Sequence, residues 1–374
     1  MGFFSEYKQA VKILQQHHPV IFYAESRHYY QYYRQLVEDV LQKTTLPVLY
    51  ITSDNQDPLL RQSPERLQVV CIKRFLGFLF PKLKAGVVVL TMPDLDNYLF
   101  KRSAQAGSYV YMFHALVSIH QQYREKAFFH YDVFYSTGPE HTLELRKLEQ
   151  VYNLPAKKII EYGYPLLDVI RHQYKTAGKE KRDNEPLKIL VAPSWFEQCI
   201  LETCIHELVQ QLARLPVTVL IRSHPEYVKR SFKKYTALKK LADELPNVSF
   251  DENPTVISSL VLADLLITDR SGIALEYAFG TLRPVLFIDT PLKIMNPQVN
   301  QLGIEPLENR IRKELGISIT PGEITHIEEK IRQLTGSAAA YRESLRLLAN
   351  NLFYNSGQSY EEGLKYILAQ TNSA

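Results

Sequence analysis

The stretch ADLLITDRSGIALEYAFGTLRPVLFID, residues 263–289, decides the fold of this chain. A short apolar run at 265–267 precedes a polar turn, a helical pattern opens at Ser271, and a second apolar run follows Pro284. This order predicts a strand, a tight turn, a helix and a second strand. Serine is a favourable N-cap residue, and the free amides of a helix N-terminus bind anions. The stretch therefore predicts a phosphate site that begins at Ser271.

Composition sets limits on the class of protein. The 374 residues are 45% apolar, which is enough for two domains with separate cores. Lys and Arg number 44 against 40 Asp and Glu, and a net charge of +4 gives no support for a nucleic-acid partner. The start has no apolar signal region, and no run of about 18 apolar residues could span a bilayer. The three cysteines form no C-x-x-C pair, so reduced thiols in a cytoplasmic protein are expected.

Apolar runs of strand length alternate with helical patterns along both halves of the chain. In the first half the predicted strands are 19–24, 47–51, 68–72, 86–91, 108–113 and 131–136, with helices notably at 28–43 and 139–152. In the second half they are 188–192, 217–221, 248–250, 265–268 and 284–288, with helices at 200–214, 226–243, 255–262 and 272–279 and a helical pattern from about 323 onward. Such apolar strands separated by helix-length segments indicate buried parallel sheets and an α/β fold.

A polar segment separates the two patterns. Residues 176–186, TAGKEKRDNEP, carry no apolar side chain larger than alanine and predict a linker. The predicted domains are 1–175 and 187–350, and a C-terminal helix within 351–374 is expected to pack back across their junction. Ligands of parallel α/β sheets bind beyond the carboxyl ends of the strands. Polar residues directly after strands are therefore the candidates for function.

Two histidines occupy equivalent positions in the two halves. His114 ends the run at 108–113, and His224 follows the run at 217–221. An imidazole at a strand end can act as a general base or as a phosphate donor near neutral pH. The alternative is that each histidine only bonds a neighbouring carbonyl. Their matching positions, together with the turn that precedes Ser271, favour one shared site.

Further candidates lie at other strand ends. The phosphate-binding candidates are Ser194, Arg222, Asp269, Arg270, Ser271 and Gly272, and the nucleoside-binding candidates are Trp195 and Glu276. Trp195 is the only tryptophan and could stack a base or anchor a domain interface. The arginines could neutralise a diphosphate or pair with carboxylates. Glu276 could accept both hydroxyls of a ribose or could favour the helix N-terminus electrostatically. No metal ion and no cofactor is assigned.

A basic and aromatic stretch in the first half allows two interpretations. Residues 73–84, KRFLGFLFPKLK, are short, bulky and apolar, with basic residues at both ends. Such a stretch can lie in a membrane interface, and an ordinary packed helix has a similar pattern. The stretch therefore predicts either peripheral contact with the inner face of the cell membrane or simple packing within the first domain.

The motifs together resemble the CDP-glycerol glycerophosphotransferases of the teichoic-acid and capsule type. The resemblance covers most of 107–290. The motifs that carry it, in the order of that family, are Phe113-His114-Ala115, Gly163-Tyr164-Pro165 with Asp168, Ala-Pro-Ser-Trp at 192–195, Arg-Ser-His-Pro at 222–225 and Ile-Thr-Asp-Arg-Ser at 267–271. It implies the GT-B architecture, in which two Rossmann-like domains with parallel sheets face a central cleft. It also implies that 1–175 binds the acceptor and 187–350 the nucleotide donor.

The chain departs from the pattern of that family at several positions. Arg222 stands where the family usually has lysine, and Ala115 where it has glycine. The family has Thr-Asp-Tyr-Ser-Ser where this chain has Arg270-Ser271-Gly272 after Thr-Asp, and often aspartate where Glu276 stands. Losing the second serine removes one hydroxyl donor, while Arg270 adds a cation. These differences make the fold a firmer expectation than glycerol as the transferred group.

The resemblance implies a reaction and roles for both histidines. A hydroxyl of a cell-surface polymer, or of its lipid-linked precursor, would attack the β-phosphorus of CDP-glycerol and release CMP. His114 would be the base, while His224, Ser271 and the following amides would hold the donor phosphates. The alternatives are a GT-B glycosyltransferase that uses a nucleotide-sugar for surface polysaccharide, a nucleotide-sugar 2-epimerase, and a non-catalytic binding module.

Overall fold

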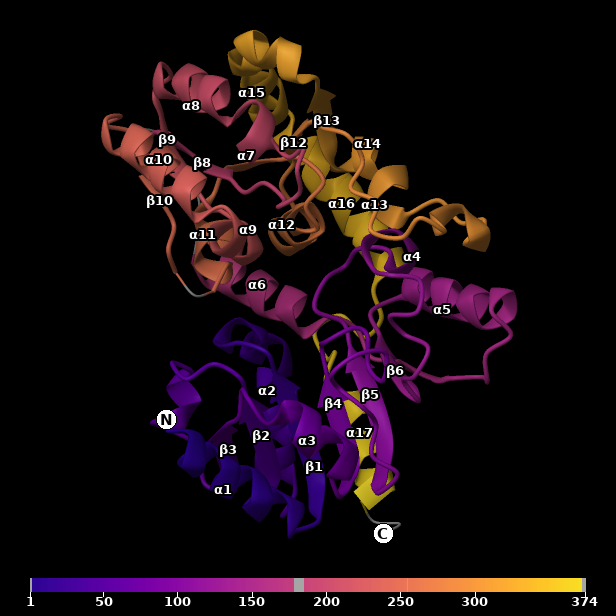
Figure 1. Ribbon diagram of the computed structural model, residues 1–374. Helices are drawn as coiled ribbons and strands as arrows, with labels where there is room; N and C mark the ends of the chain where they lie inside the picture. Colours follow the sequence, from indigo (N-terminus) through magenta and orange to yellow (C-terminus); the bar gives the residue numbers. More distant parts are fainter. Residues whose placement is uncertain (1, 178–184, 254, 372–374) are drawn as a thin grey trace.

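The computed structural model describes residues 2–177, 185–253 and 255–371. It contains two sheets, one in each half of the chain, which lie on opposite sides of the molecule's middle (Figure 1). The first has seven strands in the order β3-β2-β1-β4-β5-β6-β7, and the second has six in the order β10-β9-β8-β11-β12-β13. Every strand pair is parallel. The predicted α/β class with two parallel sheets is confirmed.

The strands have the following bounds. Those of the first sheet are β1 His18–Ala24, β2 Val48–Thr52, β3 Leu67–Cys71, β4 Ala85–Leu90, β5 Ala106–Met112, β6 Val133–Ser136 and β7 Lys158–Glu161. Those of the second are β8 Leu187–Val191, β9 Val217–Ile221, β10 Val248–Phe250, β11 Leu265–Thr268, β12 Val285–Ile288 and β13 Gly316–Ile319.

The helices fill the connections between the strands. In the first half they are α1 Phe3–Leu14, α2 Tyr30–Lys43, α3 Leu76–Leu79, α4 Ile119–Gln122, α5 Pro139–Val151 and α6 Pro165–Thr176. In the second half they are α7 Ile200–Thr203, α8 Ile205–Ala213, α9 Pro225–Arg230, α10 Phe232–Asp243, α11 Ile257–Leu262, α12 Ile273–Thr281, α13 Leu307–Arg310, α14 Arg312–Leu315, α15 Ile327–Gly336, α16 Ala338–Leu352 and α17 Glu361–Thr371. Short 3-10 turns lie at Arg27–Tyr29, Pro58–Leu60, Phe80–Lys82, Val299–Leu302 and Pro321–His326.

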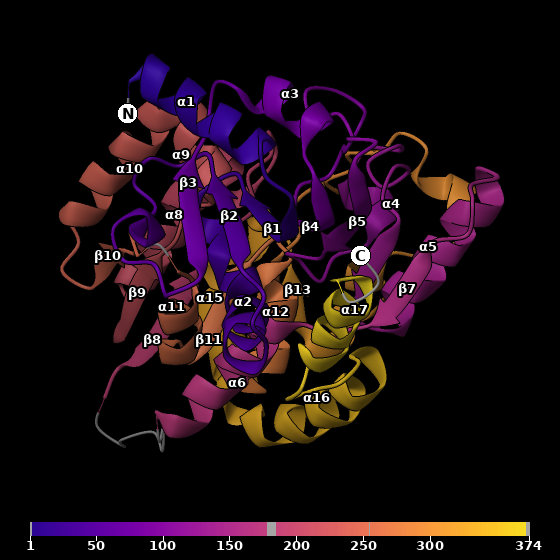
Figure 2. The same cartoon turned by 90° about the horizontal axis from the view of Figure 1, so that it is seen from below.

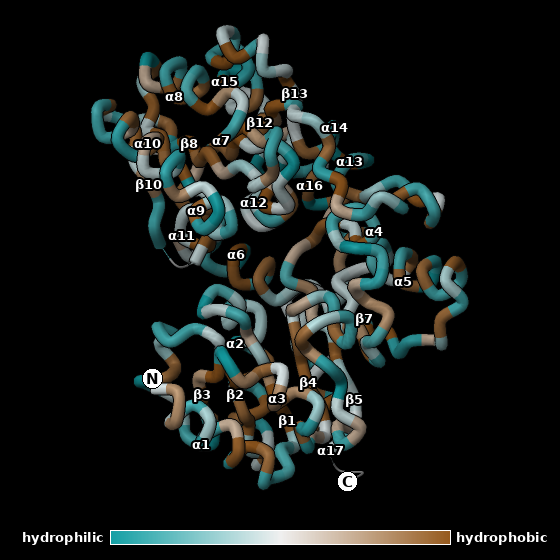
Figure 3. Tube along the Cα trace, viewed as in Figure 1, coloured by the Kyte–Doolittle hydropathy of each residue, from teal (hydrophilic) through white to brown (hydrophobic). Residues whose placement is uncertain are grey.

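The central strands are buried on both faces. Every residue of β2 and of β11 is buried, and strands of both sheets are among the brown, apolar parts of the trace in Figure 3. Helix α12 is apolar on nearly every side because it packs against α6, α11 and α16 as well as the sheet. Burial on both faces explains why these strands read as continuous apolar runs.

Several elements differ from those predicted. Strands β7 and β13 were missed, since each has only four residues and the pattern KIIE or GISI is too short to be distinctive. The predicted helix 226–243 is broken into α9 and α10 at Ser231, whose backbone is not helical. The N-cap of α12 is Gly272 rather than Ser271, and no side chain caps this helix. Helix boundaries commonly shift by one residue in this way.

Two helices pack against elements of the other half: α6 on the helices α11 and α12, and α17 on the first sheet. Leu166 and Ile170 of α6 share a core with α12, and Leu364 and Ile367 of α17 share a core with β1. Figures 1 and 2 show α17 beside the first sheet, where it contacts α2, β4 and β7. The segment before α17 is anchored by the carboxylate of Asp168, which accepts hydrogen bonds from the Gly357 amide and the Ser359 hydroxyl.

The packing of α6 and α17 against the other half of the chain affects the predicted division into domains. Helix α6 lies within the predicted first domain but packs against the second, and most of the predicted linker, residues 178–184, lies outside the described residues. The predicted domain boundaries at 175 and 187 therefore remain a proposal. They divide the sequence, whereas the packing of α6 crosses them. No helix among the described residues is long and apolar enough to cross a membrane.

Candidate active site

The carboxyl ends of the two sheets meet across a narrow gap. The loop after β5 carries His114 and Val117, and the turn after β11 carries Ser271 and Gly272. A Cβ atom at Gly272 would lie only 2.7 Å from Cγ1 of Val117. A side chain at Gly272 would force Val117 to shift, so the start of α12 touches the loop of the other half that holds His114.

His114 lies among tyrosine rings. The ring centroids of Tyr29, Tyr32 and Tyr123 are 5.4, 6.0 and 6.2 Å from the imidazole, and the Tyr111 hydroxyl is 3.5 Å from Nδ1. Burial lowers the pKa of His114 to about 4, against the opposing effect of a hydrogen bond to the backbone of Thr91. The imidazole is therefore neutral at pH 7 and can accept a proton.

His224 caps helix α9 with a fixed tautomer. Its Nδ1 accepts a hydrogen bond from the Glu226 amide at 3.1 Å, which places the proton on Nε2. Burial, followed by the charge of Lys293, lowers the pKa of His224 to about 3, and His114 contributes in the same direction. The two imidazoles are thus close enough to interact electrostatically. The structure brings together the two histidines that the sequence placed at equivalent strand ends.

Asp269 positions the loops of the site. This carboxylate is fully buried, and it accepts hydrogen bonds from the backbone N–H of Ser194 at 2.8 Å, Arg270 at 2.7 Å and Ile200 at 3.0 Å. Both oxygens of the carboxylate are therefore occupied by backbone amides. Asp269 thus holds the loop after β8 against the turn after β11, and its contact with phosphate stays a prediction.

The start of α12 offers the amides that the sequence predicted. Ser271 and Gly272 are half-buried and precede a nine-residue helix. The first amides of a helix have no intrahelical partner, and the helix dipole adds positive potential at this end. Ser271 therefore lies beside the anion-binding end of α12, although it is not the capping residue.

The two candidate arginines have different surroundings. Nη1 of Arg222 donates to the buried carboxylate of Asp251 at 2.6 Å and to the Asn253 carbonyl at 3.1 Å. Arg270 donates from Nε to the Thr290 carbonyl at 2.9 Å, and its side chain also lines a pocket. Arg222 thus anchors the loop after β10, whereas Arg270, which also pairs with Asp289 at 3.5 Å, is the arginine of the two that lines the pocket.

Two cations lie over the ring of Trp195. Nζ of Lys293 is 4.2 Å from the ring centroid and Cζ of Arg230 is 4.9 Å from it, while the His224 ring is 5.9 Å away. Lys293 was missed by the sequence interpretation. The sequence feature that could have identified Lys293 is its position shortly after the predicted strand 284–288.

Glu276 is buried at the seam between α12 and the first half. Its Oε1 accepts a hydrogen bond from the hydroxyl of Tyr164 at 2.6 Å, and only 7% of the residue is exposed. Burial raises the pKa of Glu276 to about 7, although the Tyr164 hydrogen bond opposes the rise. The Tyr164 ring lies 6.1 Å from Tyr32, which in turn flanks His114. Binding a ribose at Glu276 would require this bond to Tyr164 to open.

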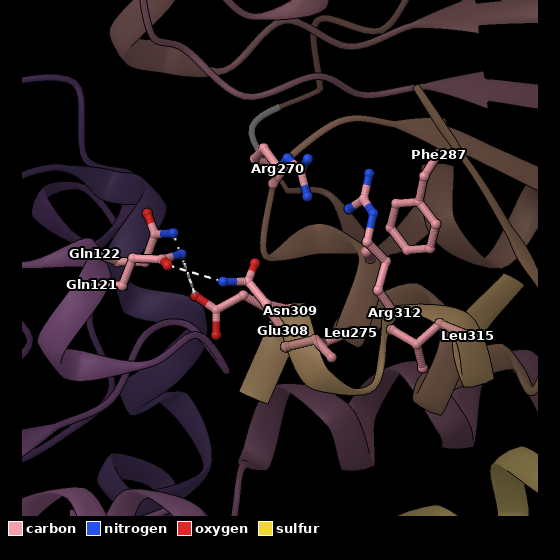
Figure 4. Close-up of a pocket in the computed structure, with 11 residues that line it drawn as sticks. Gln121, Gln122, Arg270, Leu275, Phe287, Glu308, Asn309, Arg312 and Leu315 are labelled. Carbon is pink, nitrogen blue, oxygen red and sulfur yellow. Dashed lines mark hydrogen bonds between the residues drawn. The ribbon is translucent and has the colours of Figure 1, made fainter. Parts of the chain in front are cut away.

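Ser271 lines a pocket that has both polar and apolar walls (Figure 4). It encloses about 340 Å³, part of it open solvent, between the guanidinium of Arg270 and the amides of Gln121 and Gln122 from the first half. The remaining lining residues are Ala274, Leu275, Phe287, Glu308, Asn309, Arg312 and Leu315. Burial lowers the pKa of Arg312 to about 10, so this second arginine remains charged at pH 7.

Comparison with protein families gives a match at this site. The model of the CDP-Glycerol:Poly(glycerophosphate) glycerophosphotransferase family matches residues 105–294, just over half of the chain. The chain belongs to this family. The matched segment contains both histidines, Ser194, Trp195, Ser271 and Lys293. This glycerophosphotransferase is accordingly a transferase that uses a nucleotide-activated donor. No curated protein matches the chain.

Solved structures show the fold of this glycerophosphotransferase. The wall teichoic acid polymerase TagF is 14% identical with a TM-score of 0.65, over 99% of this chain and 98% of that chain. MnaA of S. aureus, solved with UDP, is 10% identical with a TM-score of 0.58, over 94% and 97%. A glycosyltransferase from Rickettsia africae ESF-5 is 11% identical with a TM-score of 0.51, over 96% and 100%. The predicted GT-B-like architecture is confirmed.

Proposed function

We propose that this protein transfers glycerol phosphate from CDP-glycerol to a terminal hydroxyl of a teichoic-acid-type polymer, or of its lipid-linked precursor, and releases CMP. The observation that carries the proposal is the neutral imidazole of His114, which lies on the loop that touches the start of α12 and within electrostatic range of His224. A base and an anion-binding helix end on opposite walls are what a phosphoryl transfer between two substrates needs.

The chemistry follows from these positions. The acceptor oxygen attacks the β-phosphorus of the donor, a new P–O bond forms, and the bond from that phosphorus to the bridging oxygen of CMP breaks. His114 takes the proton of the acceptor hydroxyl. The Nε2–H of His224 and the amides at Ser271 and Gly272 donate hydrogen bonds to phosphate oxygens, and this stabilises the charge on the departing CMP.

The test is a substrate screen with a matched pair of variants. We expect purified protein to release CMP from CDP-glycerol when an acceptor is present, and His114→Ala to lower turnover by roughly 10²–10⁴-fold because the general base is lost. CMP binding, measured by calorimetry, should survive in this variant. His206→Ala is the control, since His206 is exposed on α8.

Three results would contradict the proposal. Turnover of His114→Ala close to that of the wild type would remove His114 as the base. Release of UDP from UDP-sugars without release of CMP would identify a glycosyltransferase instead. Conversion of a UDP-sugar without any acceptor would identify an epimerase. CDP-ribitol belongs in the same mass-spectrometric screen because it tests the transferred polyol.

We also propose contact with an anionic membrane surface through an aromatic patch made of Phe3, Phe4, Tyr7, Phe75 and Phe78. Phe3 and Phe4 are 53% and 78% exposed. The Phe3 ring lies 4.9 Å from Phe75, and the Tyr7 ring 6.1 Å from Phe78. Exposed basic residues near the patch in sequence or contact are Lys8, Lys73, Arg74 and Lys82. Aromatic rings beside lysine and arginine suit an interface with anionic lipids.

One residue of the basic and aromatic stretch does not belong to the patch. Phe80 is fully buried and packs against Tyr23 and Phe100 in the first core. The two interpretations of residues 73–84 therefore apply to different residues. Phe80 is packed in the core, whereas Phe75 and Phe78 are half-buried beneath α1.

A further inference from the structure

We propose that Lys293, together with the hydroxyls of Ser194 and Thr290, forms a subsite for a phosphate oxyanion. In this subsite the ring of Trp195 holds the ammonium group of Lys293 by a cation–π contact, and the base of the nucleotide does not stack on it. The inference rests on the proposed function, because the ligand in turnover would be the diphosphate of the donor. No strand-end motif singled out Lys293 or Thr290, and the predicted role of Trp195 is reversed.

The cation of Lys293 has an aromatic neighbour but no carboxylate partner. Nζ lies 4.2 Å from the Trp195 centroid, and no ion pair within residues 2–177, 185–253 and 255–371 includes Lys293. Arg230 lies over the same ring. A base that stacked on Trp195 would have to displace these cations, whereas an anion would be attracted by them.

Two buried hydroxyls point to a missing partner. Ser194 and Thr290 are each only 2% exposed, and in the described part of the chain neither side-chain oxygen has a hydrogen-bond partner. They follow β8 and β12, the two strands that flank β11. A buried hydroxyl left unpaired costs about 1–3 kcal/mol. The oxygens of a bound phosphate would satisfy both hydroxyls.

The segment that carries Lys293 is held in place by the first half of the chain. The Met295 amide donates to the Gln121 carbonyl at 2.9 Å, and the Asn296 side chain donates to the His120 carbonyl at 3.0 Å. Both carbonyls belong to α4, which directly follows the loop that carries His114. The position of Lys293 is thus coupled to that of the proposed base.

The ammonium group of Lys293 loses its proton close to neutral pH. Burial lowers the pKa of Lys293 to about 8, although the carboxylate of Asp269 opposes the shift. The ammonium is present at pH 7 and is lost as the pH rises through 8. Binding of an oxyanion supplies the missing counter-charge and raises this pKa again.

The experiment uses inorganic pyrophosphate as the probe and calorimetry as the readout. We expect Lys293→Met to weaken pyrophosphate binding at pH 7 by roughly 10- to 100-fold, since a charged hydrogen bond is lost. Lys293→Arg should retain binding at pH 7. Wild-type affinity should fall above pH 8, whereas Lys293→Arg should show no such fall. Lys240→Met, an exposed lysine of α10, is the matched control.

The single tryptophan provides a second readout. Because Trp195 is the only tryptophan, its fluorescence reports on this subsite alone. We expect pyrophosphate to change the emission and cytidine, which has the base but no phosphate, to leave it unchanged. The opposite result would show that the base stacks on Trp195 and would overturn the inference. Lys293→Met with pyrophosphate affinity within twofold of the wild type would overturn it as well.

A failure of the proposed function would give a different experimental result from a failure of the proposed subsite. If Lys293→Met loses pyrophosphate binding while CDP-glycerol is not turned over, the subsite stands and the donor is another diphosphate compound. If CDP-glycerol is turned over equally by Lys293→Met and wild type, the transferase stands and the subsite falls. Thermal melts of each variant show whether a loss of binding reflects unfolding.

Discussion

Glu276 shows how one buried carboxyl links the two halves of the chain. It lies on α12, its partner Tyr164 precedes α6, and Tyr164 packs against Tyr32 beside His114. A carboxyl that is 7% exposed is more stable protonated than ionised. This contact explains the glutamate at this position without requiring a ribose.

The pH dependence of stability tests this assignment. Because burial raises the folded-state pKa of Glu276 to about 7, above the unfolded value near 4.5, its contribution is complete below pH 4.5 and is lost as the pH rises to 7. We expect wild type to lose about 3 kcal/mol more than Glu276→Gln between pH 4.5 and 8, measured by urea unfolding. The glutamine keeps an acceptor for Tyr164 and does not titrate. Parallel stability curves would show that Glu276 is ionised throughout.

At the scale of elements, α1 and the turn of α3 form a surface that neither has alone. Glu6 of α1 accepts hydrogen bonds from the amides of Lys73 and Arg74, with the Lys73 bond at 2.7 Å. This contact brings the aromatic residues of α1 against Phe75 and Phe78. The aromatic patch therefore depends on two segments that are about 60 residues apart in the sequence.

Vesicle flotation tests the aromatic patch. We expect the wild type to float with vesicles that contain an anionic lipid and to be released by high salt, because both apolar burial and charge contribute. The variant Phe3→Asp, Phe4→Asp, Phe78→Ser should remain at the bottom of the gradient. Leu347→Asp, at an exposed leucine of α16, is the control. An unaltered profile of the triple variant would remove the membrane proposal.

At the scale of the molecule, the two halves are joined by buried polar contacts as well as by the chain. The carboxylate of Glu308 accepts hydrogen bonds from the Ser118 amide at 3.0 Å and the Ser118 hydroxyl at 2.9 Å. Arg310 makes an exposed ion pair with Glu140 across the same junction. Since the first contact is more buried than the second, the two should differ in energy.

Removing each contact in turn tests this difference. We expect Glu308→Ala to destabilise the protein by about 2–3 kcal/mol, because it leaves the amide of Ser118 unpaired. Amide exchange of residues 113–122, which include His114, should accelerate. Arg310→Ala should cost less than about 1 kcal/mol and leave exchange unchanged. Equal effects of the two variants, measured by hydrogen exchange and urea unfolding, would show that Glu308 does not join the halves.

Local pattern determined much of this protein. The apolar runs predicted most strands because parallel strands are buried on both faces, and the residues after them gave His114, His224 and Ser271. Parallel strands end on the same edge of a sheet, so strand-end residues of one half must gather there. The family resemblance added the reaction and the roles, which periodicity does not contain.

Only the tertiary structure decided which side chains meet. It placed Lys293 on Trp195, Glu276 on Tyr164 and Phe80 in the core, and it packed α6 on α11 and α12 and α17 on the first sheet. The physical reason is that periodicity encodes which face of an element is buried, but not against which partner. The partner depends on close packing between segments that are distant in sequence.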